Sequence, residues 1–236
     1  MSGEGISAVA FDLDDTVCTR DGDPETLYDR AFEHAGVDRF GEPAELWSAL
    51  TGAPDPNDER AYFAAGFVVV AARNGRPEVD ATALADGLLA SIDHGAVSFA
   101  PGARDALATA RSRGPVAILT NGPEWRQAPK LSALGLDDAV DAVVYAGDMA
   151  RRKPHADPFD RVCSLLDTAH AETLYVGDSL EHDVAGAQGA GLPAAWVPAP
   201  GRDRPVDDEG RPDPRPFDPE YVLATLAEFG SALPAA

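Results

Sequence analysis

Short apolar runs alternate with longer amphipathic segments along most of the chain. Several of these runs have the length and composition of buried β-strands: Ala8–Phe11, Val116–Leu119, Ala142–Ala146, Leu174–Val176 and Ala194–Val197. Most of them are followed by a polar or glycine-rich turn and then by a helical pattern. A strand that is apolar on both faces needs cover on both faces. The alternation therefore predicts an α/β fold, with a parallel sheet core and helices on both faces.

This alternation is interrupted after the first run. The sequence that follows shows helical patterns instead, separated by proline and glycine: Glu25–Ala35, Pro43–Leu50, Asp58–Arg73 and Ala81–Ser91. We therefore expect a helical cap domain at residues 17–97, inserted into a core domain formed by residues 1–16 and 98–236.

The C-terminal part has a different pattern. Residues 198–216 are rich in proline, aspartate and arginine, which predicts an exposed loop. Residues 219–229 are amphipathic, with apolar positions at Tyr221, Val222, Leu226 and Phe229. This pattern predicts a last helix packed on the core.

Two aspartates directly follow the first predicted strand. Asp12 and Asp14 are two residues apart, so in extended chain their side chains point the same way, with Leu13 turned toward the core. The carboxyl end of a parallel strand is where open α/β sheets bind ligands. Two carboxylates at that place can hold Mg²⁺ and divide the roles of nucleophile and acid/base.

Further polar groups follow the next predicted strands. Thr120 and Asn121 end the second strand before Gly122, and a hydroxyl with turn amides before a helix can hold a phosphate group. After the third strand, Lys153 can neutralise a phosphoryl group and the carboxylate beside it. The only other lysine in the chain is Lys130, in the helix after Asn121, and we assign it a structural role.

The fourth predicted strand is followed by Asp178 and then by Asp183. Asp178 stands where a further carboxylate would complete a hard-cation site with Asp12. Asp183, in the turn into the next helix, is placed to orient a metal-bound water. The histidines form no HxH or HExxH pair, so zinc is not indicated.

Together these strand ends resemble the four signatures of the haloacid dehalogenase superfamily, in that superfamily's order. The signatures are Asp12-x-Asp14-x-Thr16, the Thr120 turn, Lys153-Pro154, and Gly177-Asp178 followed by Asp183. The resemblance covers residues 7–16 and 99–197. It implies a Rossmann-like core, and the helical insert stands where the superfamily places a small helical cap.

The resemblance also implies a reaction, the hydrolysis of a small phosphate monoester. Asp12 would attack phosphorus and form an aspartyl-phosphate, while Asp14 would protonate the leaving group and then activate water. Thr120, Asn121 and Lys153 would hold the phosphoryl oxygens. The implied substrate is a small phosphorylated metabolite.

The implied cofactor is Mg²⁺. In the superfamily's pattern it would be bound by Asp12, Asp178 and the backbone carbonyl of Asp14. Asp183 and Thr16 would support this site without contacting the substrate themselves.

Three other functions stay open. A sugar phosphomutase shares the motifs and a helical cap, and would return the phosphoryl group to its substrate instead of to water. A haloacid dehalogenase has no carboxylate at the position of Asp14, because halide needs no proton to leave, so Asp14 favours phosphate ester chemistry. A phospho-accepting binding module would use Asp12 as a signalling site, but such modules are usually smaller and lack an inserted cap.

The cap contains no substrate motif. Candidates for facing the substrate are Trp47, Arg60, Tyr62 and Arg73. Packing or solvation explains each of them equally well, so phosphosugar, phosphoglycolate and nucleotide monophosphate all stay open as substrates.

The charge balance limits which binding partners and which cellular environment we expect. The chain has 40 acidic residues against 19 Lys and Arg, a formal net charge of −21, and such a surface repels nucleic acid and anionic membranes. This composition, rich in acidic residues and with arginine in place of lysine, resembles that of proteins from salt-in halophiles. Two distant cysteines fit a reducing cytosol, and residues 1–7 show no signal peptide. We expect a cytoplasmic protein of a halophilic archaeon, as monomer or homodimer.

Overall fold

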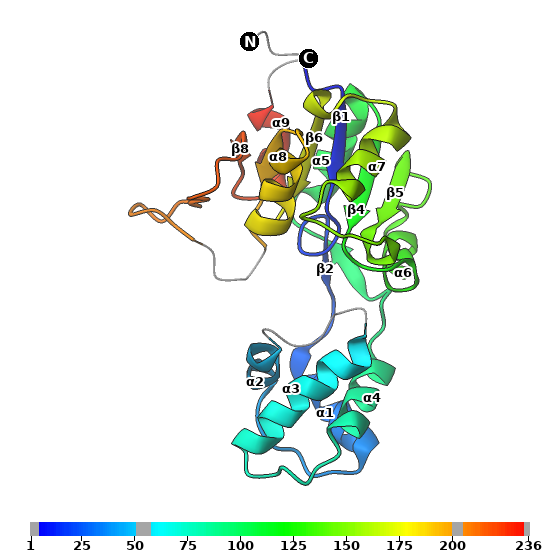
Figure 1. Ribbon diagram of the computed structural model, residues 1–236, viewed down its shortest axis with the longest axis vertical. Coiled ribbons are helices and arrows are strands. Elements are labelled where there is room, and N and C mark those ends of the chain that lie inside the picture. The colour runs from blue at the N-terminus through cyan, green and yellow to red at the C-terminus, as the bar shows by residue number, and fades with distance from the viewer. Residues whose placement is uncertain (1–4, 51–57, 200–204, 234–236) are drawn as a thin grey trace. The chain divides into compact units, whose positions relative to one another are not determined.

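The computed structural model describes residues 5–50, 58–199 and 205–233. The chain divides into two compact units, one of residues 1–20 and 95–236 and the other of residues 21–94. Figure 1 shows the first unit as a sheet flanked by helices and the second as a group of helices. Among the described residues, no helix combines the length and the apolar character that a membrane crossing requires.

A six-stranded sheet lies at the centre of the first unit. From edge to edge its strands are β5 (Ala142–Tyr145), β4 (Val116–Thr120), β1 (Ala8–Phe11), β6 (Thr173–Gly177), β7 (Ala194–Trp196) and β8 (Tyr221–Val222). Every pair of neighbours is parallel. The predicted parallel α/β sheet is therefore confirmed. Because β1 lies between β4 and β6, the carboxyl ends of these three strands meet at one edge.

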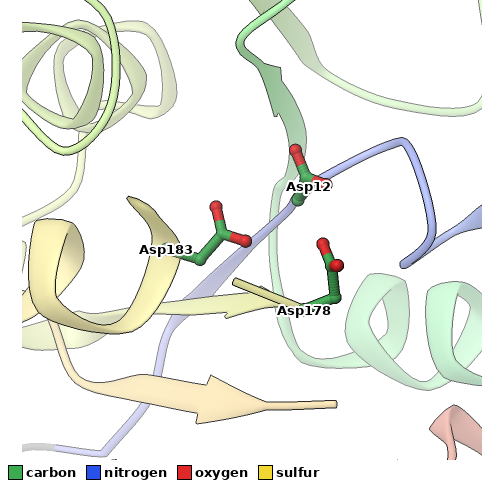
Figure 2. Close-up of side chains that lie close together, drawn as sticks. All are labelled: Asp12, Asp178 and Asp183. Carbon is green, nitrogen blue, oxygen red and sulfur yellow. The ribbon is translucent and has the colours of Figure 1, made fainter. Parts of the chain in front are cut away.

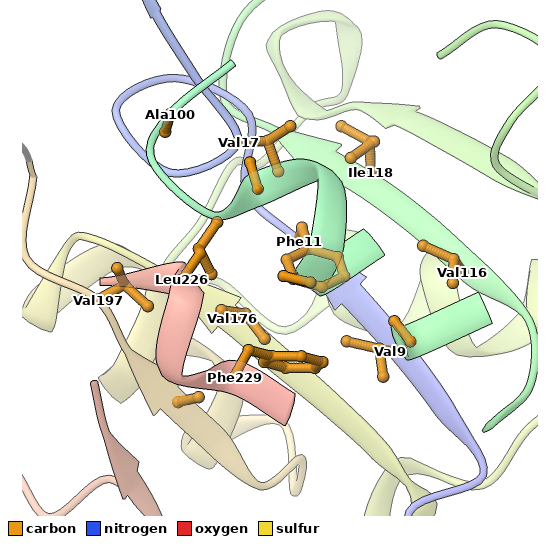
Figure 3. Packing of buried hydrophobic residues seen from close by; sticks show 14 of the residues in the cluster. Val9, Phe11, Val17, Ala100, Val116, Ile118, Val176, Val197, Leu226 and Phe229 are labelled. Atoms are coloured by element: carbon orange, nitrogen blue, oxygen red, sulfur yellow. The ribbon is translucent and has the colours of Figure 1, made fainter. Parts of the chain in front are cut away.

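The central strands bury both of their faces. In β1, Val9 and Phe11 enter one apolar cluster, while Ala8 and Ala10 enter the other, as the alternation of side chains in a strand requires. Figure 3 shows the first cluster. The helices that supply these clusters are α5 (Ala103–Arg113) and α6 (Glu124–Leu134) on one face, and α7 (Asp157–Leu166), the π-helical turn η3 (Leu180–Ala185) and α8 (Gly186–Gly189) on the other.

Short elements complete this unit. Strands β2 (Cys18–Arg20) and β3 (Val97–Phe99) form a small antiparallel pair, and 3₁₀ turns lie at η1 (Ala146–Asp148) and η2 (His170–Glu172). The sequence pattern did not predict the strand pair, because three-residue strands that are only partly buried contain no apolar run.

The second unit contains the predicted helices, with ends within one residue of expectation. They are α1 (Pro24–Ala35), α2 (Pro43–Ala49), α3 (Glu59–Arg73) and α4 (Ala81–Ser91). Asp23, Asp58 and Asp80 cap three of them by accepting backbone N–H bonds in the first turn. Tyr28, Phe32 and other aromatic and aliphatic side chains form the unit's own core. Its assignment as a cap stays a prediction.

The predicted helix over residues 219–229 is wrong. This segment forms the edge strand β8, the 3₁₀ turn η4 (Leu226–Glu228) and the start of the short α9 (Phe229–Ala232). Tyr221 pairs with Ala195, and the Leu223 N–H donates to the Trp196 carbonyl at 2.9 Å. Residues 221 and 222 therefore pair as a strand with the otherwise open edge of β7. This tertiary pairing overrides the helical preference of the sequence pattern.

The predicted exposed loop is described only in part. Residues 200–204 lie outside the described ranges, and among residues 205–216 the chain makes one isolated bridge, between Val206 and Pro212. Val206 is 51% exposed, as an exposed loop requires.

The C-terminal segment contributes to the core, which a truncating substitution tests. Phe229 is 1% exposed and packs on Phe11 with ring centroids 5.5 Å apart (Figure 3). Phe229→Ala should lower the free energy of unfolding by about 3–5 kcal/mol. Val222→Ala, at a side chain that is 40% exposed, should change it by about 0.5 kcal/mol or less. Urea unfolding in KCl measures both, and equal stabilities would show that the segment is not part of the core.

Candidate active site

The carboxyl ends of the central strands bring together side chains that are far apart in the sequence. Asp12 follows β1, Thr120 ends β4 and Asp178 follows β6, while Lys153 comes from the loop after η1. Figure 2 shows Asp12, Asp178 and Asp183 side by side at this edge of the sheet.

Three carboxylates form a candidate metal site. Asp12, Asp178 and Asp183 each offer one oxygen, and these oxygens lie within 4.8 Å of one another. Carboxylate oxygens at the mouth of a sheet are the ligands that a hard cation such as Mg²⁺ prefers. Asp183, expected only in support, belongs to this cluster. The side chain of Asp14 lies outside this cluster, with its oxygens bonded by Gln127 and Lys130. The role expected of the Asp14 backbone carbonyl stays a prediction.

Lys153 is the buried cation of the cluster. Its side chain is 3% exposed, and its Nζ donates to Oδ1 of Asp12 and to Oδ1 of Asp183, each at 2.7 Å. Burial alone would lower the pKa of this amine, but the charges of the two aspartates outweigh it and raise the pKa. Lys153 therefore remains an ammonium ion.

One ammonium ion does not neutralise three carboxylates. Burial raises the pKa of Asp12 well above its ordinary value, and the charges of Asp183 and Asp178 add to this effect against that of Lys153. An excess of negative charge in a nearly buried place is stabilised by a further cation. The residues present therefore fit Mg²⁺.

Asp183 is held firmly by its surroundings. Its Oδ2 accepts the Ser179 N–H at 2.9 Å, and its Oδ1 accepts Tyr175 Oη at 3.3 Å as well as Lys153. Asp183 lies in the π-helical turn η3. Such turns are rare in proteins as a whole, and those that do occur are often found at functional sites. Thr16 Oγ1 donates to Oδ1 of Asp178 at 3.4 Å.

Asn121 and Thr120 have distinct tasks in the structure. The Asn121 amide pairs with the backbone of Lys153, accepting from its N–H at 2.9 Å and donating to its carbonyl at 3.0 Å. The Asn121 side chain therefore positions Lys153, and a direct bond to a phosphoryl group stays a prediction. Thr120 Oγ1 accepts from the Gly122 N–H at 3.2 Å and from Gln127 at 2.6 Å, which turns its hydrogen toward other acceptors.

Sequence reasoning missed three side chains at this site. Lys130, given only a structural role, bonds Asp14, and so does Gln127. Tyr175, read as an apolar strand position, accepts from Lys153 at 2.8 Å. The sequence did contain a signal for Lys130 and Gln127. Both lie with Leu131 on the buried face of α6, where apolar side chains are expected instead of a charged side chain and an amide.

The side chains proposed to face a substrate lie in the second unit. Arg60 forms a two-pronged ion pair with Asp86, at 2.6 and 2.7 Å. The rings of Trp47 and Tyr62 both pack edge-on against Phe63, and Trp47 remains 45% exposed. Of the candidates, Arg60 is thus already paired, and a role in binding stays a prediction for all four.

Comparison with known proteins agrees with this geometry. A model of the haloacid dehalogenase-like hydrolases matches residues 6–191. A phosphoglycolate phosphatase of Yersinia pestis is 31% identical over 192 residues, 80% of either chain. A ribulose-1,5-bisphosphate 5-phosphatase of Halopiger xanaduensis is 31% identical over 202 residues, 79% of this chain and 82% of that one. The crystal structure of the Bacillus subtilis hydrolase YfnB superimposes with a TM-score of 0.71 at 21% identity, covering 97% and 98% of the two chains.

The chain therefore belongs to the haloacid dehalogenase-like hydrolases, and the resemblance of its four motifs to that superfamily is confirmed. The structural likeness, at 21% identity, shows the shared fold.

The approach of Asp183 to the sheet depends on a glycine. A Cβ on Gly177 would lie 2.4 Å from the carboxylate carbon of Asp183, which is closer than van der Waals contact allows. Gly177→Ala should displace Asp183, lower the free energy of unfolding by about 1–3 kcal/mol, and weaken Mg²⁺ binding. Calorimetric Mg²⁺ titration and denaturant unfolding measure both effects.

Gly189→Ala is the matched control. Apart from its chain neighbours and the backbone of its own helix, no atom of the described residues lies within 4 Å of a Cβ at this position of α8. It should leave Mg²⁺ binding unchanged and alter stability by about 1 kcal/mol or less, because alanine is the better helix former. Parent-like Mg²⁺ binding in Gly177→Ala would argue against a metal role for Asp183.

Proposed function

We propose that this chain, a phosphatase of the haloacid dehalogenase superfamily, hydrolyses small phosphate monoesters with Mg²⁺ through an aspartyl-phosphate on Asp12. The observation that carries the proposal is the place of Asp12: it directly follows the central strand, lies within the three-carboxylate cluster, and is bonded at 2.7 Å by a buried ammonium ion. Such an arrangement holds an anionic group against a nucleophile and neutralises its charge.

In the first half of the reaction, a carboxylate oxygen of Asp12 attacks phosphorus and the bond from phosphorus to the ester oxygen breaks. Asp14 gives that oxygen its proton, so an alcohol leaves. Lys153 and the Thr120 hydroxyl hold the phosphoryl oxygens meanwhile. A bound Mg²⁺, held by the carboxylates of Asp12, Asp178 and Asp183 together with the backbone carbonyl of Asp14, would supply further positive charge against those oxygens.

In the second half, Asp14 takes a proton from water while the water oxygen attacks phosphorus. The bond from phosphorus to Asp12 breaks, which releases inorganic phosphate and restores both aspartates. Asp14 gave its proton to the alcohol in the first half, so it is a carboxylate when the water attacks and can act as the base.

The phosphatase proposal is supported over the alternatives. Relatives at 31% identity that cover about four fifths of the chain are named as phosphatases, and their named substrates are small phosphorylated acids or sugars. Asp14 supports ester chemistry over dehalogenation. The presence of an acid/base residue, Asp14, beside the nucleophile Asp12 supports turnover over a phospho-accepting module. We propose the predicted cap of residues 17–97, of which residues 21–94 form the second compact unit, as the part that selects the substrate.

The direct test is phosphate release from a panel of phosphorylated sugars, phosphoglycolate and nucleotide monophosphates, in high KCl, with Mg²⁺ or with EDTA. We expect release that depends on Mg²⁺. Activity only in the presence of a sugar bisphosphate, without net phosphate release, would identify a mutase instead.

The nucleophile is tested by Asp12→Asn. We expect turnover to fall by at least about 10³-fold, because no aspartyl-phosphate can form on an amide. Circular dichroism and cooperative unfolding should show an intact fold. Asp138→Asn, at an exposed position outside the site, is the matched control and should retain full activity. Near-normal turnover in Asp12→Asn would remove Asp12 as the nucleophile.

We also propose adaptation to concentrated salt, supported by the formal net charge of −21. Salt screens the mutual repulsion of surface carboxylates. The melting temperature should rise with KCl by at least about 5 °C, or roughly 2 kcal/mol for a chain of this size. Sucrose, which strengthens burial without screening charge, is the control. Equal stability in dilute buffer and in KCl would refute the adaptation.

A further inference from the structure

Two side chains of α6 hold the carboxylate of Asp14 from both sides. Gln127 Nε2 donates to Oδ2 at 2.7 Å, and the Lys130 ammonium donates to Oδ1. Each oxygen of Asp14 has its own donor, so rotation of the carboxylate about its Cβ–Cγ bond would break both bonds. Each oxygen also keeps lone-pair capacity for a further proton. The result is a carboxylate with a fixed plane that can still exchange a proton.

Lys130 is an unfavourable choice if it serves the fold alone. Its side chain is 1% exposed, whereas that of its partner Asp14 is 45% exposed. Burying an ammonium ion is costly even when it is paired, and an apolar side chain of similar volume is often as stable or more stable. The only other lysine, Lys153, lies in the same way against Asp12. Both lysines of the chain are thus buried against the two carboxylates that follow β1.

Gln127 is equally unfavourable for the fold. It is fully buried, and within the described part of the chain its Oε1 has no hydrogen-bond partner. An unmade bond of this kind costs about 1–3 kcal/mol. The orientation of the amide follows from Asp14, because a carboxylate only accepts and must face the NH₂ end. That same NH₂ group also bonds the Thr120 hydroxyl at 2.6 Å.

The turn before α6 provides the space for this amide. A Cβ on Gly122 would come within 2.4 Å of Gln127 Nε2. Gln127 and Lys130 are three residues apart, so they lie on the same face of the helix, one turn apart. One helix face therefore reaches both the acid/base residue and the predicted phosphate-binding hydroxyl.

We propose that Lys130 and Gln127 are positioning residues, which hold Asp14 where it first protonates the leaving group and then takes a proton from water. The inference rests on the phosphatase function proposed above. It assigns to this chain two residues outside the four motifs. Lys130 acts through Asp14, Gln127 acts through Asp14 and also bonds the Thr120 hydroxyl, and neither touches the substrate.

The test compares two monoesters that differ in their need for an acid. An alkoxide must be protonated to leave, whereas p-nitrophenolate leaves without a proton. The value of kcat/KM reports on the steps up to phosphorylation of Asp12, and kcat also includes hydrolysis of the aspartyl-phosphate. A misplaced Asp14 therefore lowers kcat/KM for an alkyl ester but largely spares kcat/KM for p-nitrophenyl phosphate.

We expect Lys130→Met and Gln127→Leu to lower kcat/KM by about 10²-fold or more for the best alkyl ester of the panel, and by about tenfold or less for p-nitrophenyl phosphate. With p-nitrophenyl phosphate, kcat and KM should decrease together and a burst of p-nitrophenol should appear, because hydrolysis of the aspartyl-phosphate still needs Asp14 as a base. Asp14→Asn should show the same selective loss of kcat/KM for the alkyl ester, and the loss should be larger than in either of these variants.

Leu131→Ala is the matched control. It removes a fully buried side chain of the same helix and loosens the same packing without touching Asp14, so it should change both kcat/KM values by one common factor. Equal losses for the two esters in Lys130→Met and Gln127→Leu would overturn the inference. Gln127→Leu alone decides the matter if Lys130→Met does not fold. A parent chain that hydrolyses neither ester contradicts the proposed function, and the inference with it.

Discussion

The rest of the site depends on the ion pairs that the buried Lys153 forms with Asp12 and Asp183. Three carboxylates meet at the end of the central strands, and without a buried cation their repulsion and desolvation would oppose that arrangement. Lys153 bonds two of them at 2.7 Å, and its backbone is held in turn by the amide of Asn121. The parallel sheet brings the three carboxylates together, and the charge of Lys153 reduces the repulsion between them.

The fold and the strand-end acids could be predicted because their signals are local. A run such as Ala8–Phe11 is apolar on both faces, and Asp12 follows it directly, so one short stretch of sequence specifies both the strand and the place of the acid. The partners of that acid could not be predicted in this way. Lys130 and Gln127 lie 116 and 113 residues from Asp14, and the contact depends on which strands are neighbours. The C-terminal segment was mispredicted for the same reason, since its partner is the open edge of β7.

Asp15 forms the turn that follows the two acids of the site. It has a φ of 60°, in the left-handed region that glycine enters without strain. Aspartate is among the few other residues that enter this region at modest cost, because its short polar side chain can bond locally. Its backbone N–H also donates to the Cys18 carbonyl at 2.8 Å, which closes the turn directly after Asp14.

The acidic surface and the buried lysines are two parts of one electrostatic arrangement. A formal net charge of −21 would repel an anionic phosphate ester in dilute buffer. In molar salt the Debye length is only about 3 Å, so the surface field no longer reaches an approaching substrate. Buried charges are screened far less. An exposed lysine would thus contribute little in such a solvent, whereas Lys153 and Lys130, 3% and 1% exposed, are screened much less from the carboxylates of the site.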